Sequence, residues 1–205
     1  MANKTVALYI TSGETFTGKS SLCVGLGLRF RSDGFRVGYM KPVSTTAKRI
    51  AGRVVDEDAE FMKKVFQLEE DLETLAPVCL DPITVESILQ GGKNDLVKVL
   101  QAAYEQASRD KDIMLLEGGA SLPDGTLVGL NSQKVAELLG AQELVVNRYL
   151  NDLCVDSLLL HQELLGESML GGVLNAVPKQ SLEHVESLVR PFLEAQGISI
   201  YAVLP

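Results

Sequence analysis

The sequence predicts a doubly wound α/β domain, in which a mainly parallel sheet carries helices on both faces. Two observations support this prediction. Short apolar runs bounded by turn residues alternate with longer amphipathic stretches, which is the pattern of repeated βα units. Most of the apolar runs also lack polar alternation, as expected of strands that helices cover on both sides.

The strands are predicted where valine, isoleucine, leucine or tyrosine cluster. They are Thr5 to Thr11, Arg36 to Lys41, Ile113 to Glu117, Glu143 to Asn147, Met169 to Asn175 and Ile198 to Leu204. The polar stretch from Pro42 to Gly52 follows the second of these strands. We therefore predict an active-site loop there, at the carboxyl edge of the sheet.

The first predicted helix opens at Lys19 and ends near Gly34, which is suited to a left-handed C-cap. Its glycines Gly25 and Gly27 either let the helix approach the sheet closely or are merely tolerated. Further helices are predicted at Asp56 to Phe66, Lys93 to Arg109, Ser132 to Leu139, Asp152 to Leu165 and Ser181 to Ala195.

Composition indicates one compact domain over residues 1–205, because 205 residues that are 46% hydrophobic can bury one sizeable core. A net charge of -8 without a basic patch argues against nucleic-acid binding. No apolar run is long enough for a signal-peptide core or a membrane span, so we expect a cytoplasmic protein.

Cysteine and histidine do not suggest a metal site. Cys23, Cys79 and Cys154 lie far apart without a C-x-x-C pair, which argues against zinc and against a disulfide framework. His161 and His184 lie on predicted helices with no partner cysteine or histidine nearby. We interpret both histidines as solvated helix positions.

The segment Gly13 to Ser20 reads G-E-T-F-T-G-K-S, a complete G-x-x-x-x-G-K-S/T phosphate-binding loop between a predicted strand and helix. Its backbone N–H groups are expected to form a nest for phosphate oxygens. Lys19 is expected to neutralise the β- and γ-phosphates, and Ser20 to offer its hydroxyl to Mg²⁺. We predict nucleotide contacts from Gly13, Glu14, Thr15, Phe16, Thr17, Gly18, Lys19, Ser20 and Ser21.

Three acidic or basic segments accompany the loop. Glu117 ends an apolar strand and is predicted to orient Mg²⁺, although without the loop a simple strand-end acid would deserve about equal weight. Lys41 ends another strand and either stabilises a transferred phosphoryl group, holds an anionic substrate or is a solvated charge. Asp56 to Asp58 either complement a helix dipole or reach Mg²⁺.

The phosphate loop, K-P-V at Lys41 to Val43, Asp58-Ala59, E-G-G from Glu117 and G-V-L-N at Gly172 to Asn175 together resemble dethiobiotin synthetase in order and approximate spacing. This resemblance covers nearly the whole chain. It implies ATP and Mg²⁺ as cofactors, and a homodimer. It also implies that Lys19 and Lys41 are catalytic, that Ser20, Asp58 and Glu117 bind Mg²⁺, and that Asn175 contacts adenine.

The residues alone leave the role of Asn175 open. Asn175 by itself reads as a strand-end turn residue, although its amide can both donate to and accept from a purine edge. On the substrate side, we expect contacts from Lys41, Thr45 and Gly118.

Two segments, Gly129 to Leu139 and Leu165 to Gly172, resemble the P-loop domain at the N-terminus of phosphotransacetylase-related and DRTGG-domain proteins. The sequence ends after the strand Ile198 to Leu204 with no further helix. We therefore expect the N-terminal part of a longer protein.

The substrate loops depart from dethiobiotin synthetase. The chain has E-G-G-A-S-L-P-D-G from Glu117 where that family has E-G-A-G-G, and the dimer partner's substrate segment is not recognisable in Asn147 to Asp152. Because the nucleotide residues persist, we predict a regulatory, nucleotide-sensing module that binds Mg-ATP. The alternative is an ATP-dependent ligase, carboxylase or phosphotransferase that acts on a small carboxylate or carbamate.

Overall fold

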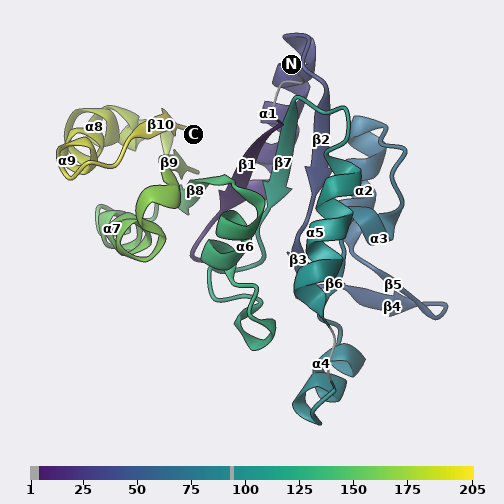
Figure 1. Cartoon of the computed structure of the whole chain (residues 1–205). Coiled ribbons are helices and arrows are strands. Elements are labelled where there is room, and N and C mark those ends of the chain that lie inside the picture. Colours follow the sequence, from purple (N-terminus) through teal and green to yellow (C-terminus); the bar gives the residue numbers. More distant parts are fainter. Residues whose placement is uncertain (1–4, 93–94) are drawn as a thin grey trace.

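A six-stranded parallel sheet forms the centre of the protein. The structure is a computed structural model that describes residues 5–92 and 95–205 (Figure 1). The strands lie in the order β10-β9-β8-β1-β7-β2, and all five neighbouring pairs are parallel. They are β1 (Val6–Thr11), β2 (Val37–Met40), β7 (Ile113–Glu117), β8 (Gln142–Arg148), β9 (Met169–Asn175) and β10 (Ile200–Val203). The predicted sheet is therefore confirmed.

Helices cover both faces of this sheet, as predicted. On one face, α1 (Lys19–Ser32) and α2 (Glu57–Phe66) pack against β1, β2 and β7. On the other face lie α5 (Leu96–Ala107), α6 (Ser132–Leu139) and α7 (Cys154–Leu165). Of these, α5 and α6 stand in front of the sheet in Figure 1. The first two residues of the predicted helix Lys93 to Arg109 lie outside the described residues.

The last predicted helix is not uniform. It consists of α8 (Leu182–His184), a π-helical segment (Val185–Val189) and α9 (Arg190–Ala195). Pro191 lies in the first turn of α9 and has no backbone N–H to donate. The wider π-helical turn before it accommodates the missing hydrogen bond and the bulk of the proline ring.

The region from Pro42 to Gly52 differs from the single polar loop that we expected. It contributes β3 (Val43–Ser44), which pairs with β6 (Val78–Cys79), and β4 (Lys48–Ile50), which forms a hairpin with β5 (Arg53–Val55). Ala51 and Gly52 turn this hairpin with positive φ values of 49° and 81°. Only the residues between the two strand pairs remain as loop.

Short elements between the main ones were also missed. They are α3 (Leu72–Leu75), α4 (Pro82–Leu89) and the 3₁₀ turns Thr126–Val128, Gly166–Ser168 and Lys179–Ser181. Asp81 caps α4 by accepting a hydrogen bond from the backbone N–H of Thr84, and Pro82 follows at the first helical position. This capping pattern is visible in the sequence and could have predicted α4.

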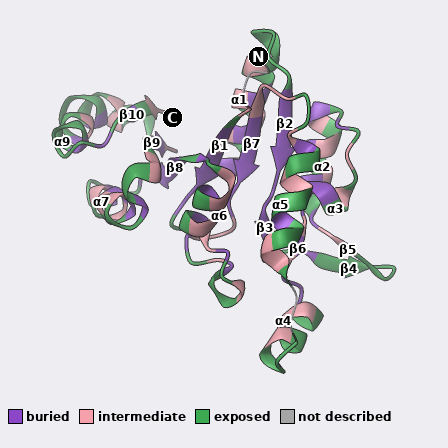
Figure 2. Cartoon of the chain, viewed as in Figure 1, coloured by how far each residue is buried: buried purple, intermediate pink, exposed green. Residues whose placement is uncertain are grey.

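The interior of the protein consists of the sheet and the inner helix faces, as the burial colours of Figure 2 show. A Cβ atom on Gly27 would lie 2.4 Å from the Phe66 ring, so this glycine permits the close contact between α1 and α2. Gly25 has open space around it and serves no such contact. Within the described residues, no helix is both long and apolar enough to cross a membrane.

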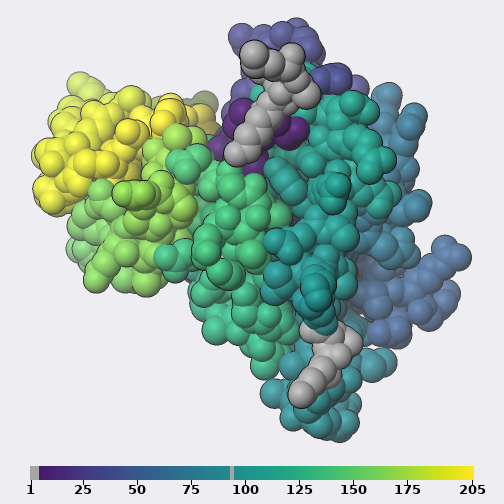
Figure 3. Space-filling view, viewed as in Figure 1, coloured from purple at the N-terminus to yellow at the C-terminus, as the bar shows by residue number. Residues whose placement is uncertain are grey.

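Parallel strands bring the predicted site residues to one edge of the sheet. The phosphate loop follows β1, Lys41 follows β2, and Glu117 ends β7 opposite Ile10 of β1. This is the edge where open α/β sheets bind ligands. In the space-filling view, helices α8 and α9 form one end of the molecule and the β4–β5 hairpin projects at the other (Figure 3).

Candidate nucleotide-binding site

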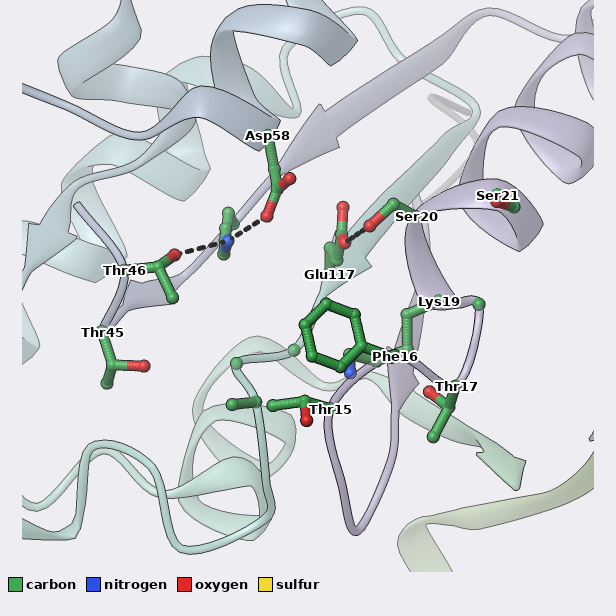
Figure 4. A pocket seen from close by; sticks show the side chains of 15 residues that line it. Thr15, Phe16, Thr17, Lys19, Ser20, Ser21, Thr45, Thr46, Asp58 and Glu117 are labelled. Carbon is green, nitrogen blue, oxygen red and sulfur yellow. Dashed lines mark hydrogen bonds and ion pairs between the residues drawn. The ribbon is translucent and has the colours of Figure 1, made fainter. Parts of the chain in front are cut away.

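A cavity of about 470 Å³ opens at this edge, between the phosphate loop and the ends of β2 and β7 (Figure 4). It gathers most of the residues that the sequence had singled out. Its lining consists of Thr15, Phe16, Thr17, Gly18, Lys19, Ser20, Ser21, Lys41, Thr45, Thr46, Asp58, Glu117, Gly118, Gly119 and Ala120. Thr46, Gly119 and Ala120 were not predicted.

The phosphate loop presents unused backbone donors. None of the N–H groups from Gly13 to Gly18 donates a hydrogen bond to any residue that the structure describes. Gly18 caps α1 with a φ of +95°, a conformation that favours glycine, and a Cβ there would lie 2.2 Å from the Asn175 amide nitrogen. Such a loop at a helix N-terminus is suited to bind phosphate oxygens.

Lys19 folds back over the loop. Its Nζ donates to Ser12 Oγ at 2.6 Å and lies 3.5 Å from the Glu14 carbonyl oxygen. Burial lowers the pKa of Lys19, although the nearby Glu117 carboxylate opposes that shift. The ammonium group therefore sits beside the cavity, held by neutral oxygens that an anion can replace.

Glu117 lies buried at the floor of the cavity. Ser20 Oγ donates to one carboxylate oxygen at 2.6 Å, and the Tyr39 hydroxyl donates to the other at 2.7 Å. Burial raises the pKa of Glu117, and these two hydroxyl donors only partly offset that effect. Tyr39 was not predicted as a site residue. Its place on β2, two residues before Lys41, is the signal that could have identified it.

Lys41 lies between two aspartates. Its Nζ is 3.1 Å from Asp56 Oδ2 and 2.5 Å from Asp58 Oδ2, and the side chain is almost fully buried. Burial alone would lower the pKa of Lys41, but the two carboxylates outweigh it and hold the pKa above its ordinary value. The interpretation of Lys41 as a solvated strand-end charge is therefore wrong.

The end of the cavity near Thr45 and Ala120 is organised by Asp124, which the sequence did not reveal. Its carboxylate accepts hydrogen bonds from Thr45 Oγ1 at 3.0 Å, from the Ala120 N–H at 2.8 Å and from Ser121 Oγ at 2.9 Å. Gly118 is held by a backbone bond to Ile10. Asp124 therefore ties the loop after β7 to the loop that carries Thr45.

Asn175 lies outside the main cavity, in a neighbouring apolar pocket of about 280 Å³ that it shares with Gly18, Ser21 and Leu204. Its Nδ2 donates to the Thr17 carbonyl oxygen at 2.7 Å, so the side chain supports the phosphate loop. The second amide hydrogen and Oδ1 have no partner within the described residues and are available to a ligand.

Gly13 and Glu14 line a separate cavity of about 490 Å³ on the other side of the loop, next to α7. His161 lies there, and only 3% of it is exposed, so our interpretation of this histidine as solvated is wrong. Its Nδ1 faces the Ser157 carbonyl oxygen and therefore carries the proton. A Cβ on Gly13 would lie 2.7 Å from the imidazole ring. Periodicity alone could not show which face of α7 meets the loop.

The oxygen ligands of the cavity suit Mg²⁺. Ser20, Asp58 and Glu117 offer a hydroxyl and two carboxylates, without sulfur or nitrogen donors. Within residues 5–92 and 95–205, no group of three or more histidine, cysteine, aspartate or glutamate side chains forms a ready metal cage. Mg²⁺ needs no such cage, because it is usually held by one or two carboxylates together with phosphates and water.

Comparisons with known proteins agree with this geometry. A family model described as an AAA domain matches residues 6–205. ATP-dependent dethiobiotin synthetase BioD from Caldicellulosiruptor bescii is 29% identical over 57% of this chain and 49% of its own length. The same enzyme from Aromatoleum aromaticum is 28% identical over 89% and 83%. The chain thus spans only about half the length of the first of these relatives.

Solved structures support the fold alone. The cell division protein FtsY from Thermotoga maritima has a TM-score of 0.57 and 16% identity, over 98% of this chain and 61% of that one. FtsY from Mycoplasma mycoides has a TM-score of 0.56 and 13% identity, over 98% and 59%. With the family model spanning nearly all residues, the chain belongs to the AAA domain family, as a P-loop domain related to dethiobiotin synthetase.

Proposed function

We propose that the chain binds Mg-ATP at this cavity, in the cytoplasm. The unused N–H groups from Thr15 to Gly18, which line this cavity beside Lys19, are the observation that carries the proposal, because such groups would form a nest for phosphates. Ser20, Asp58 and Glu117 would hold Mg²⁺, which would neutralise charge on the β- and γ-phosphates. The apolar pocket beside Asn175 would take the adenine ring.

A calorimetric titration with Mg-ATP tests this proposal. Lys19→Ala should weaken binding about 10- to 100-fold, because a hydrogen bond to a charged group contributes about 1.5–3 kcal/mol. Lys134→Ala serves as the control, because this half-buried lysine of α6 does not line the cavity and its ammonium group pairs with Glu137. Wild-type protein that fails to bind, or a Lys19→Ala variant that binds equally well, would reject the proposal.

For the output of ATP binding, we propose a regulatory role as a nucleotide-sensing module. Lys41 supports it, because two aspartates neutralise this lysine, so it can stabilise a transferred phosphoryl group only after one of them is displaced. On the resemblance of Gly129 to Leu139 and Leu165 to Gly172, we propose attachment to a phosphotransacetylase-related domain.

A specific observation favours the second candidate, an ATP-dependent ligase, carboxylase or phosphotransferase. The cavity continues past Lys41 to Thr45 and Ala120, where a small carboxylate or carbamate could bind. The two candidates are separated by measuring ADP release with small carboxylates, and with diaminopelargonate plus bicarbonate. Strong substrate-dependent turnover supports the enzyme, whereas slow turnover that no substrate stimulates supports the sensor.

We also propose that the chain forms a homodimer through α7. Leu153, Leu160 and Leu164 follow one another at i, i+7 and i+11 and are 70%, 54% and 49% exposed. Leu160 and Leu164 lie on α7 and Leu153 is its N-cap, so the three share one face. Leu150, in the segment before the helix, is also exposed. Exposed leucines on one face are suited to an interface, and the related family implies a dimer.

A further inference from the structure

The two aspartates that hold Lys41 differ in how firmly they are fixed. Asp56 is fully buried and caps α2, where it accepts hydrogen bonds from the Ala59 N–H at 2.8 Å and from Ser44 Oγ at 2.5 Å. The Asp58 side chain is 46% exposed. Within the described residues, Lys41 is its only hydrogen-bond or ion-pair partner (Figure 4). Asp56 is therefore a fixed anchor, and Asp58 is free to change its partner.

Asp58 also lines the same cavity as Ser20 and Glu117, the other two residues expected to bind Mg²⁺. The Asp58 oxygen that contacts the Lys41 ammonium group is thus one that a metal ion would compete for. A divalent ion attracts a carboxylate more strongly than an ammonium group does at the same distance, because the attraction grows with charge.

We propose that Asp58 exchanges Lys41 for the metal ion, so that Mg²⁺ binding frees Lys41 to receive an anionic group. This inference rests on the proposed Mg-ATP site. Two further partners remain to hold the Lys41 ammonium group at the cavity after the exchange: Asp56, which lies 3.1 Å from it in the present structure, and Thr46 Oγ1, which lies 3.5 Å from it. Asp56 is then the residue that positions Lys41, and Asp58 is the residue whose change of partner makes Lys41 available.

The exchange makes the metal and Lys41 competitors for one carboxylate. Removing the lysine charge should therefore tighten metal binding, and the gain should depend on Asp58. If Lys41 instead weakened metal binding only by long-range charge repulsion, removing its charge would tighten metal binding equally in a protein without the Asp58 carboxylate. This difference separates the proposal from long-range repulsion, and it can be measured without any catalytic activity.

The experiment measures Mn²⁺ affinity by electron paramagnetic resonance at saturating ADP, in wild type, Lys41→Gln, Asp58→Asn and the double variant. Glutamine keeps a hydrogen-bond donor for Asp56, and thermal melting confirms that each variant is folded. We expect Lys41→Gln to tighten Mn²⁺ binding about tenfold, which lies within typical coupling energies. Asp58→Asn should weaken binding, and in that background Lys41→Gln should change the affinity less than about twofold.

Three results would overturn the exchange. They are unchanged Mn²⁺ affinity in Lys41→Gln, an equal gain in both backgrounds, and an Asp58→Asn variant that binds Mn²⁺ as wild type does. In each of these cases the wild type still binds Mn²⁺ with ADP, so the proposed nucleotide site stands. A wild type that binds neither ADP nor Mn²⁺ would instead reject the nucleotide site and the exchange together.

Discussion

At the scale of single residues, the contact between Gly13 and His161 fixes one side of the phosphate loop. The imidazole occupies the space that a side chain at position 13 would need, because a Cβ there would lie 2.7 Å from Cε1. Burial lowers the pKa of His161, so the ring is neutral at pH 7, and its Nε2 has no partner within the described residues. The ring therefore acts as a packing wall for the loop.

This contact predicts an energetic coupling between the two positions. Gly13→Ala should destabilise the protein by about 1–3 kcal/mol, because it overpacks a filled site. In a His161→Ala background the same substitution should cost much less, since the ring that it meets is gone. Urea denaturation of the four proteins measures the coupling. Equal costs of Gly13→Ala in both backgrounds would show that the ring does not shape the loop.

At the scale of elements, the packing of α1 against α2 depends on one of the two glycines in α1. Gly27→Ala should destabilise the protein by about 1–3 kcal/mol, because its Cβ meets Phe66 and Leu115 in the core. Gly25→Ala should stabilise it by about 0.5–1 kcal/mol, because alanine favours helix and the site is open. Chemical denaturation measures the change in unfolding free energy for each variant. Changes of the same sign in both variants would contradict the different roles of the two glycines.

Arg36 and Asp112 join the starts of β2 and β7. The Asp112 carboxylate accepts from the Arg36 guanidinium and from its backbone N–H, and the N–H groups of Asp112 and Ile113 donate to the Arg36 carbonyl oxygen. These bonds, chiefly the one from the Arg36 side chain, lower the pKa of Asp112 from 3.8 to about 2. This pairing of Arg36 with Asp112 therefore favours the ionised carboxylate in the folded state.

The sign of the pH dependence follows from that shift. Because the folded pKa lies below the unfolded one, the stabilisation is complete above about pH 5 and is lost as the pH falls toward about 2. The difference in unfolding free energy between wild type and Asp112→Asn should shrink over that window. Urea melts at a series of pH values measure it. A difference in unfolding free energy that stays constant between about pH 5 and about pH 2 would contradict a stabilising Arg36–Asp112 pair.

Local sequence patterns predicted the long elements and missed the short ones. The six strands and the helices α1, α2, α5, α6 and α7 were expected, because their apolar residues recur at a regular period. The β3–β6 pair is two residues long and is defined by a distant partner, so no local period reveals it. Asp124 and His161 reach the loops only through tertiary contacts, which explains why they were missed.

At the scale of the whole molecule, the exposed leucine face of α7 predicts the oligomeric state. Leu153→Glu or Leu160→Glu should convert a dimer into monomers, because each places a charge at the centre of an apolar interface. Leu188→Glu is the matched control, since Leu188 is 57% exposed but lies in the π-helical segment and not on α7. Sedimentation velocity measures the change. A monomeric wild type, or a dimer that survives both substitutions, would exclude this interface.

The strands β1, β2 and β7 end at the same edge of the sheet and bring the phosphate loop, Lys41 and Glu117 to a single cavity. The most direct test of this arrangement is a crystal structure with Mg²⁺ and a non-hydrolysable ATP analogue. We predict phosphate oxygens on the N–H groups from Gly13 to Gly18, Lys19 turned from Ser12 to the phosphates, and the metal at Ser20. An analogue bound elsewhere, with the loop amides still unused, would contradict the account.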